Sequence, residues 1–170
     1  MNVLDLIFSR RSVRKYKDQP VSREQLTDLL KAGMAAPSAC NNQPWEFVAV
    51  DDPAVMEELR GSLRNGPYNA PAAIITLYND KIGNNVNCNG FWQQDLSAAT
   101  ENIMIAAAGM ELGTVWLGTY PKEDTVAKVQ KILGIPENII PLVVIYVGTP
   151  ESQPEPSTKF DEERVHWNQY

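Results

Sequence analysis

The chain has 170 residues, of which 44% are hydrophobic and 21% charged, the size and composition of one compact folded domain. Its formal net charge of -6 argues against a general nucleic-acid binder or a protein drawn to anionic membranes, because both need a positive field spread over a surface. The N-terminus lacks the apolar core and cleavage site of a signal peptide and no apolar run could cross a bilayer, so we expect a cytoplasmic protein.

Three residues limit the chemistry further: Cys40, Cys88 and His166. Two cysteines are too few for a disulfide framework, and together with one histidine they show no metal-ligand spacing, so we expect no metal site. We interpret Cys40 as an ordinary small residue. One histidine near the C-terminus also argues against Ser-His or Cys-His nucleophilic catalysis.

A basic stretch, SRRSVRKY at 9–16, lies between two predicted helices. Asn2 is placed to cap the first helix, and the capping-box pair Ser22 and Gln25 begins the second, which ends before Pro37. Guanidinium groups are planar, bidentate donors that match phosphate. The stretch is therefore either a site for a discrete anion or a solvated basic turn.

A polar loop, APSACNNQPW at 36–45, follows the second helix. Amide side chains present a donor and an acceptor together, which suits the edge of a flat heterocycle carrying carbonyl and N–H groups. The alternative is a turn that is rich in Asn for conformational reasons. The next residues, WEFVAV at 45–50, predict a strand, and Asp52 and Pro53 begin a helix that runs to about Leu63.

The second half of the chain alternates strands and helices around an Asn-rich loop at 79–90. The predicted elements are strands at 72–78, 114–118 and 141–148, a long Ala-rich helix from Phe91 to Leu112, and a helix over 121–133 closed by Gly134. This order predicts a sheet covered on both faces by helices, and leaves parallel or mixed pairing open. No G-x-G-x-x-G follows a strand, so any nicotinamide must visit and leave.

The C-terminal residues, KFDEERVHWNQY at 159–170, follow a Pro-rich linker and carry aromatic side chains that a disposable terminus seldom has. They pack either on a partner subunit, which would bring Arg164 to a second anion contact, or on their own chain.

Four motifs together resemble the nitroreductase family of flavoproteins: RRSVRKY at 10–16, APSACNNQPW at 36–45, ELGTVWLG at 111–118 and RVHWNQY at 164–170. The resemblance implies an α+β fold of three layers, α/β/α, with a central mixed sheet. It also implies an obligate homodimer with FMN at the interface. Residues 1–150 would form one FMN-binding domain, and 151–170 a C-terminal extension wrapping the partner subunit.

The resemblance further implies which residues bind the cofactor. Arg10 and Ser12 would hold the phosphate and ribityl chain, with Arg11 beside them. Arg14 would reach the pyrimidine edge of the isoalloxazine, where a positive charge stabilises the reduced ring. The remaining contacts would be Pro37, Ser38, Ala39, Asn41 and Gln43 from the loop of the other subunit, the backbone at Leu117 and Gly118, and Arg164 from the tail.

The function that the resemblance implies is hydride transfer from NAD(P)H to a small organic acceptor, such as a nitroaromatic or a quinone, by a ping-pong mechanism. No side chain would be catalytic, because flavin N5 carries the chemistry. The chain lacks room for the inserted helices of better-known relatives, so residues 79–92 are the candidate cover, with Phe91 and Trp92 as substrate contacts or as core anchors. The alternative functions are an FMN storage or sensing module with little turnover, and a different flavin reaction within the family.

Overall fold

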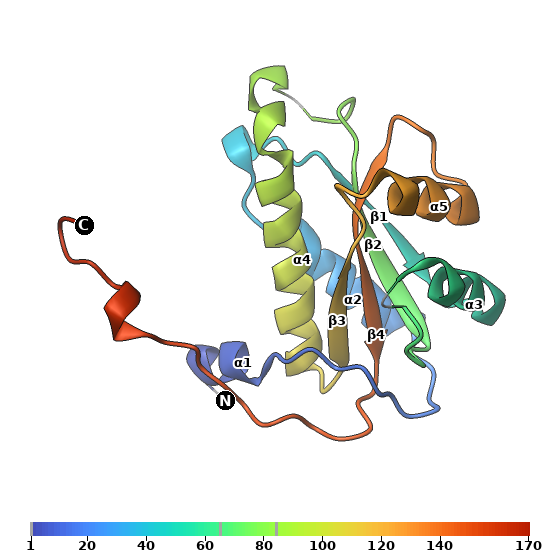
Figure 1. Ribbon diagram of the computed structural model, residues 1–170, viewed down its shortest axis with the longest axis horizontal. Coiled ribbons are helices and arrows are strands. Elements are labelled where there is room, and N and C mark those ends of the chain that lie inside the picture. The colour runs from blue at the N-terminus through green and yellow to red at the C-terminus, as the bar shows by residue number, and fades with distance from the viewer. Residues whose placement is uncertain (1, 65, 84) are drawn as a thin grey trace.

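The computed structural model describes residues 2–64, 66–83 and 85–170 of the chain. A four-stranded sheet in the order β1-β2-β4-β3 lies between two layers of helices (Figure 1). The strands are β1 (Trp45–Val50), β2 (Ala72–Tyr78), β3 (Gly113–Gly118) and β4 (Ile140–Gly148). The α-helices are α1 (Val3–Ser9), α2 (Arg23–Met34), α3 (Pro53–Ser62), α4 (Trp92–Gly109) and α5 (Glu123–Leu133), with short 3-10 helices η1 (Ala39–Asn41), η2 (Val86–Phe91) and η3 (Glu162–Arg164).

The helices cover the two faces of the sheet in pairs (Figure 1). Leu29 of α2 and Ile103 of α4 pack on the face that carries Ile74, whereas Met56 of α3 and Val129 of α5 pack on the opposite face. Successive residues of a strand point to opposite faces, so a strand between two helical layers is apolar throughout. This explains the continuous apolar sequences of β2 and β4. The predicted α+β fold with three layers is confirmed.

The strand directions differ from those of the mixed sheet that was expected. The three ladders, β1 with β2, β2 with β4 and β3 with β4, are all antiparallel. The parallel pairing found in the described part of the chain is an isolated bridge between Ser12 and Thr114. A helical connection does not fix the end from which the chain re-enters the sheet, so the alternation of elements could not determine strand direction.

The predicted helix starts are confirmed by their caps. The side chain of Asn2 accepts a hydrogen bond from the N–H of Asp5 at 2.9 Å, and Ser22 accepts from Gln25 at 3.1 Å in a complete capping box. Such caps typically stabilise a helix by about 1 kcal/mol each. Gly134 ends α5 with φ of 64°, the left-handed conformation that glycine adopts at low cost. Within 2–64, 66–83 and 85–170, no helix has both the length and the apolar character needed to cross a membrane.

The C-terminal residues 151–170 leave the sheet at the end of β4, pass α1, where the N–H of Ser157 donates to the carbonyl of Phe8 at 3.0 Å, and then extend away from the body of the molecule (Figure 1). Three aromatic side chains in this tail, Phe160, Trp167 and Tyr170, are largely or fully exposed. The aromatic side chains of the tail therefore do not pack on the body of their own chain, which was one of the two alternatives.

Candidate functional site

The basic stretch runs in an extended conformation across one end of the sheet. The N–H of Val13 donates to the carbonyl of Thr114 at 2.8 Å, and the hydroxyl of Tyr16 donates to the carbonyl of Val13 at 2.6 Å. Val13 and Tyr16 are buried, and burial raises the pKa of Tyr16. Arg14 and Lys15 are exposed. The apolar residues thus anchor the stretch and its cationic side chains project outward.

Two glycines let this stretch approach the sheet closely. Gly113 of β3 and Gly148 of β4 are cross-strand partners. A Cβ at Gly113 would lie 2.6 Å from Val13, and a Cβ at Gly148 would lie 2.8 Å from Tyr16. Real side chains do not approach so closely, so any larger residue at either glycine would displace the basic stretch.

The cationic side chains line a cavity of about 520 Å³ between α1, the basic stretch and the start of the tail. Its polar lining includes Arg10, Arg11, Ser12, Arg14, Glu101 and Lys159. Arg10 is paired with Glu101 of α4, with 3.0 Å between Nε and Oε1. Across residues 2–64, 66–83 and 85–170, the other three cations form no ion pair. The cavity therefore carries a positive excess, with planar donors suited to a phosphate group.

The amide loop has an unusual backbone. Cys40, Asn41 and Gln43 all adopt positive φ, at 53°, 53° and 49°. The left-handed region is costly for residues other than glycine, and such conformations persist where the surrounding structure imposes them. Gln43 donates through its N–H to the Ser38 hydroxyl at 2.9 Å and through its amide to Asn41 at 3.0 Å. Asn41 and Gln43 remain exposed and can contact a ligand.

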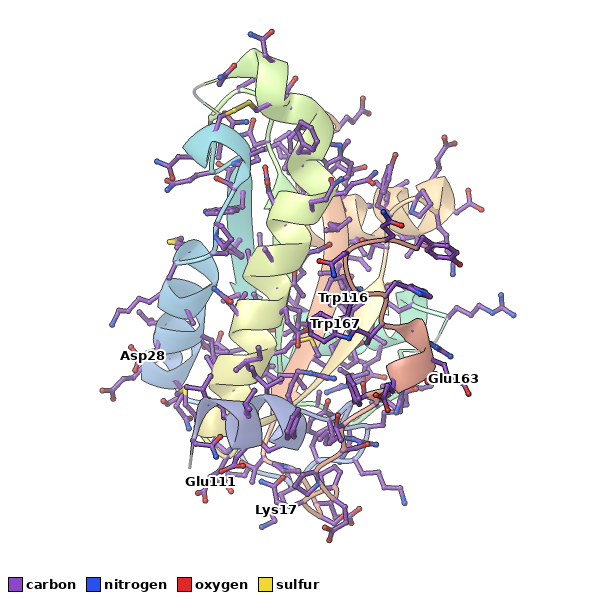
Figure 2. All side chains as sticks on the ribbon, turned by 90° about the vertical axis from the view of Figure 1, so that its left-hand side faces the viewer. Lys17, Asp28, Glu111, Trp116, Glu163 and Trp167 are labelled. Atoms are coloured by element: carbon purple, nitrogen blue, oxygen red, sulfur yellow. A yellow bond between two sulfur atoms is a disulfide. The ribbon has the colours of Figure 1, made fainter. Side chains whose placement is uncertain are left out.

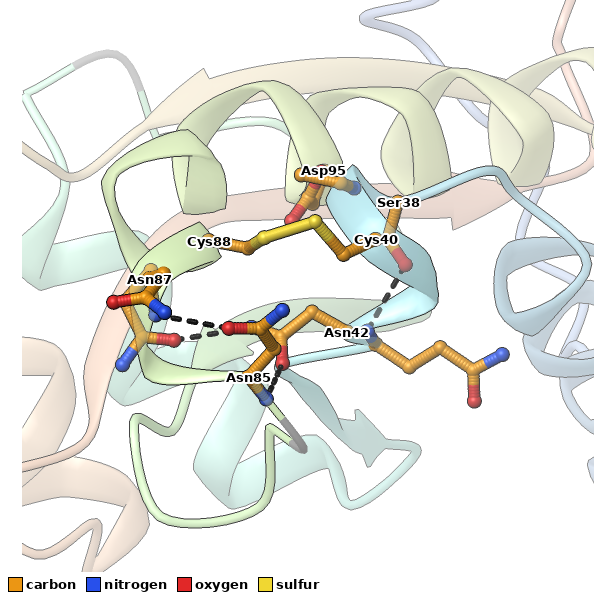
Figure 3. Close-up of a disulfide and its surroundings, with 10 residues drawn as sticks. Ser38, Cys40, Asn42, Asn85, Asn87, Cys88 and Asp95 are labelled. Atoms are coloured by element: carbon orange, nitrogen blue, oxygen red, sulfur yellow. Dashed lines mark hydrogen bonds between the residues drawn. A yellow bond between two sulfur atoms is a disulfide. The ribbon is translucent and has the colours of Figure 1, made fainter.

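Side chains from later in the chain hold this loop in place (Figure 3). Asp95 of α4 is only 4% exposed and accepts the N–H of Ala39 at 2.8 Å. Asn42 is 1% exposed, donates to the Asn89 side chain at 3.0 Å and accepts the N–H of Asn85 at 2.8 Å. These roles could not be predicted from the sequence, because residue type alone does not show which amide or carboxylate of a polar loop is buried.

A disulfide joins Cys40 of the loop to Cys88 of η2, with 6.5 Å between the Cα atoms (Figure 3). The interpretation of Cys40 as an ordinary small residue was therefore wrong. The only signal in the sequence was that there are two cysteines, and a separation of 48 residues does not reveal that they meet.

The end of β3 combines open backbone with an aromatic cluster. A Cβ at Gly118 would meet nothing within 4 Å, whereas the Leu117 side chain is buried. Trp92 stacks on Tyr78 with 4.7 Å between ring centroids and meets Tyr120 edge-on at 5.0 Å. Trp92 also packs on the core, which favours its role as a core anchor, whereas the neighbouring Phe91 is 53% exposed.

A single chain does not bring all the predicted residues together. The basic stretch lies near the C-terminal end of α4 and the amide loop near its N-terminal end (Figure 1). Because α4 has 18 residues, these ends are about 27 Å apart at 1.5 Å per residue. Arg164 is paired with Asp161 at 2.8 Å, and its side chain is 85% exposed. Arg164 belongs to the tail, which also carries Trp167. In the view of Figure 2 the tail lies between the viewer and Trp116 of the sheet.

Comparisons with known proteins give the family. The model of the Nitroreductase family matches residues 7–80 and 64–149. A protein of Archaeoglobus fulgidus with the provisional name NADH dehydrogenase/NAD(P)H nitroreductase is 39% identical over 96% of this chain and 95% of its own length. The chain belongs to the nitroreductase family.

Solved structures agree with this assignment. A Bacteroides thetaiotaomicron protein with the same provisional name is 41% identical, with a TM-score of 0.90 over 98% of this chain and 97% of that one. A provisional nitroreductase of Desulfovibrio desulfuricans, solved in complex with FMN, is 28% identical, with a TM-score of 0.80 over 100% of this chain and 99% of that one.

Proposed function

We propose that this protein is an FMN-dependent oxidoreductase that transfers hydride from NAD(P)H to a small organic acceptor, and that it works as a homodimer. The observation that carries the proposal is the cation-lined cavity near one end of α4, with a strained, exposed amide loop at the other end. Family membership supports the same conclusion.

FMN is the cofactor, and the residues present fit it. Arg10, Arg11 and Ser12 offer a phosphate monoester charge-assisted donors in a cavity with a positive excess. When bound, FMN supplies the redox chemistry, taking a hydride from NAD(P)H and passing reducing equivalents to the acceptor. The guanidinium of Arg14 adds a fixed positive charge that favours the charge gained on reduction. In this proposal no side chain transfers a proton.

The amide loop supplies the other half of each site from the partner subunit. If two copies pair about a two-fold axis across α4, the loop of one copy lies beside the basic stretch of the other, and two equal sites form. Pro37, Ser38, Ala39, Asn41 and Gln43 would then border the ring. The exposed tail, with Arg164, would cross to the partner and add a phosphate contact.

The open backbone at Gly118 leaves room for a flat ligand to approach. We assign this face to NAD(P)H and the acceptor in turn, which makes the reaction ping-pong and gives parallel double-reciprocal plots. In this proposal the exposed Phe91 covers that face. A nitroaromatic or a quinone fits such a face, and a cytoplasmic location belongs to the same proposal.

Anaerobic stopped-flow absorbance tests the proposal directly. We expect the flavin band of the purified holoprotein to bleach rapidly after mixing with NADH or NADPH, and to recover on addition of a quinone. A protein that stays yellow with both nucleotides would instead support the storage or sensing alternative.

Arg14→Ala tests the role of the basic stretch. We expect a lower flavin reduction potential and FMN binding weaker by about tenfold to a hundredfold, since a charge-assisted contact is removed. Spectroelectrochemistry and fluorescence titration measure the two effects. Arg23→Ala is the matched control, because Arg23 is an exposed arginine outside the cavity, paired with Asp51. An unchanged potential in Arg14→Ala contradicts the assigned role.

A further inference from the structure

The Cys40–Cys88 disulfide connects two segments that the proposed function uses. Cys40 lies between Ala39 and Asn41, both expected at the flavin. Cys88 lies in η2, which ends with Phe91 and is followed directly by Trp92 of α4. In the described ranges of the chain this is the one covalent cross-link, and it ties the flavin loop to the segment expected to cover the site.

A few polar contacts, together with the disulfide, hold the loop in place. Asn42 binds Asn85 and Asn89, and Asp95 binds the backbone of Ala39. One oxygen of Asp95, buried among these groups, has no partner in the described structure. Cys40 itself carries one of the three left-handed conformations. The loop conformation thus depends on the disulfide and on a network that is incompletely satisfied.

We propose that Cys40–Cys88 is a reversible thiol–disulfide exchange site, with a dithiol as its reaction partner, and that its state sets how firmly the loop holds FMN. The second part rests on the proposed function, because that function gives the loop its role. In the disulfide state the loop is fixed against η2. In the dithiol state only the polar contacts remain, and the left-handed residues can relax.

The exchange reaction takes place in two steps and begins at Cys40. Cys40 is exposed and Cys88 is 5% exposed, so the incoming thiolate attacks the sulfur of Cys40. A mixed disulfide forms at Cys40, and Cys88 leaves as a thiolate that takes up the proton lost by the incoming thiol. The second thiol of the partner then attacks the mixed disulfide and releases Cys40. The partner is oxidised to a disulfide and the pair gains two electrons and two protons.

The disulfide would be unusual in the proposed cytoplasmic location, which is a reducing compartment. Disulfides are rare in reducing compartments, and those that occur there are usually transient and redox-sensing. A disulfide with one cysteine in an exposed position is open to such exchange, whereas a structural disulfide is protected by burial.

The test compares air-oxidised protein with protein reduced by dithiothreitol. Alkylation followed by intact mass counts free thiols, amide hydrogen exchange reports residues 38–43 and 85–91, and fluorescence titration gives the Kd for FMN. We expect no free thiol before reduction and two after it, faster exchange in both segments, and a rise of about tenfold in Kd, the scale of one lost buried contact. The Cys40→Ser/Cys88→Ser double variant should show the hydrogen exchange and the Kd of the reduced protein, and dithiothreitol should change neither.

The outcomes separate this inference from the proposed function. Free thiols in the oxidised protein, or identical exchange and Kd in both states, overturn the inference while leaving FMN binding intact. A response to dithiothreitol in the double variant also overturns it. A protein that binds no FMN in either state, but shows faster amide hydrogen exchange in both segments after reduction, supports the exchange site and contradicts the proposed function.

Discussion

At the scale of single residues, Tyr146 places an unpaired hydroxyl in the core of the described structure. It is fully buried in β4, and its hydroxyl has no hydrogen-bond partner in the described structure. A buried polar group left unpaired costs about 1–3 kcal/mol. Burial raises the pKa of Tyr146 to about 12, while the charge of Arg60 lowers it and that of Glu57 raises it.

Tyr146→Phe is expected to raise the free energy of unfolding by about 1 kcal/mol near neutral pH, because the unpaired hydroxyl is removed. The raised pKa means that the folded state keeps the Tyr146 proton more tightly than the unfolded state, whose tyrosines titrate near pH 10. The stability that this tighter proton binding contributes is present below about pH 10 and is lost as the pH rises toward 12. The Tyr146→Phe variant should therefore lose less stability than the parent protein in that range.

Urea unfolding at pH 8 and pH 11, at fixed protein and FMN concentrations, measures both effects. Tyr170→Phe serves as the control, since Tyr170 is fully exposed. A variant that is less stable than the parent at pH 8 would show that the Tyr146 hydroxyl is satisfied after all. A variant that loses as much stability as the parent at pH 11 would show that the pKa of Tyr146 is not raised in the folded state.

At the scale of elements, local chemistry could be predicted from the sequence and distant pairing could not. Asn2, Ser22 and Gly134 act on backbone groups within a few residues, so each helix boundary that they set could be predicted. Asp95 and Ala39 are 56 residues apart, and nothing local to either residue indicates their hydrogen bond.

The candidate site follows the same rule. The basic residues are close together in the sequence, which indicated an anion site or a solvated turn, and the resemblance to the family supplied their expected roles. The structure places Arg10, Arg11, Ser12 and Arg14 around one cavity. The separation of this cavity from the amide loop depends on the direction of α4, and the Cys40–Cys88 pairing depends on how η2 folds back. Both are properties of the tertiary structure.

Gly113→Ala tests the close contact between the basic stretch and β3. The added Cβ would meet Val13 at 2.6 Å, so we expect the stretch to shift and FMN binding to weaken by about tenfold. Gly61→Ala is the matched control, because a Cβ there meets nothing within 4 Å and the residue lies inside α3. This control should keep its affinity and gain roughly 0.4–1 kcal/mol of stability.

Calorimetric titration of both alanine variants with FMN, alongside thermal unfolding, gives the two quantities. Equal FMN affinities in Gly113→Ala and Gly61→Ala would mean that Val13 can move without disturbing the arginines, and that the glycine is not required for the site.

At the scale of the whole molecule, the proposed homodimer would complete two features of the chain. The halves of the proposed site lie at opposite ends of α4, and Phe160, Trp167 and Tyr170 of the tail are largely or fully exposed. A self-complementary interface across α4 accounts for both, because a two-fold axis brings unlike ends together and lets each tail reach the other subunit.

Removing residues 157–170 tests this arrangement. Burying an apolar side chain contributes roughly 1.5–3 kcal/mol, and the truncation removes Phe160, Trp167 and Tyr170. We therefore expect the dimer Kd to rise by about two orders of magnitude or more, and the flavin content to fall. Sedimentation velocity over a range of concentrations and the absorbance ratio of flavin to protein measure the two effects.

The Phe160→Ala/Trp167→Ala double variant keeps the backbone of the tail and should reproduce most of the loss if aromatic burial is the cause. Glu163→Gln changes the charge of the same tail without touching its apolar side chains, and should remain dimeric and yellow. A truncated protein that stays dimeric and fully loaded with FMN contradicts the role of the tail, since α4 alone would then suffice to hold the subunits together. A full-length chain that sediments as a monomer while binding FMN contradicts the two-copy site itself, because the amide loop could then reach the flavin only within one subunit, across the length of α4.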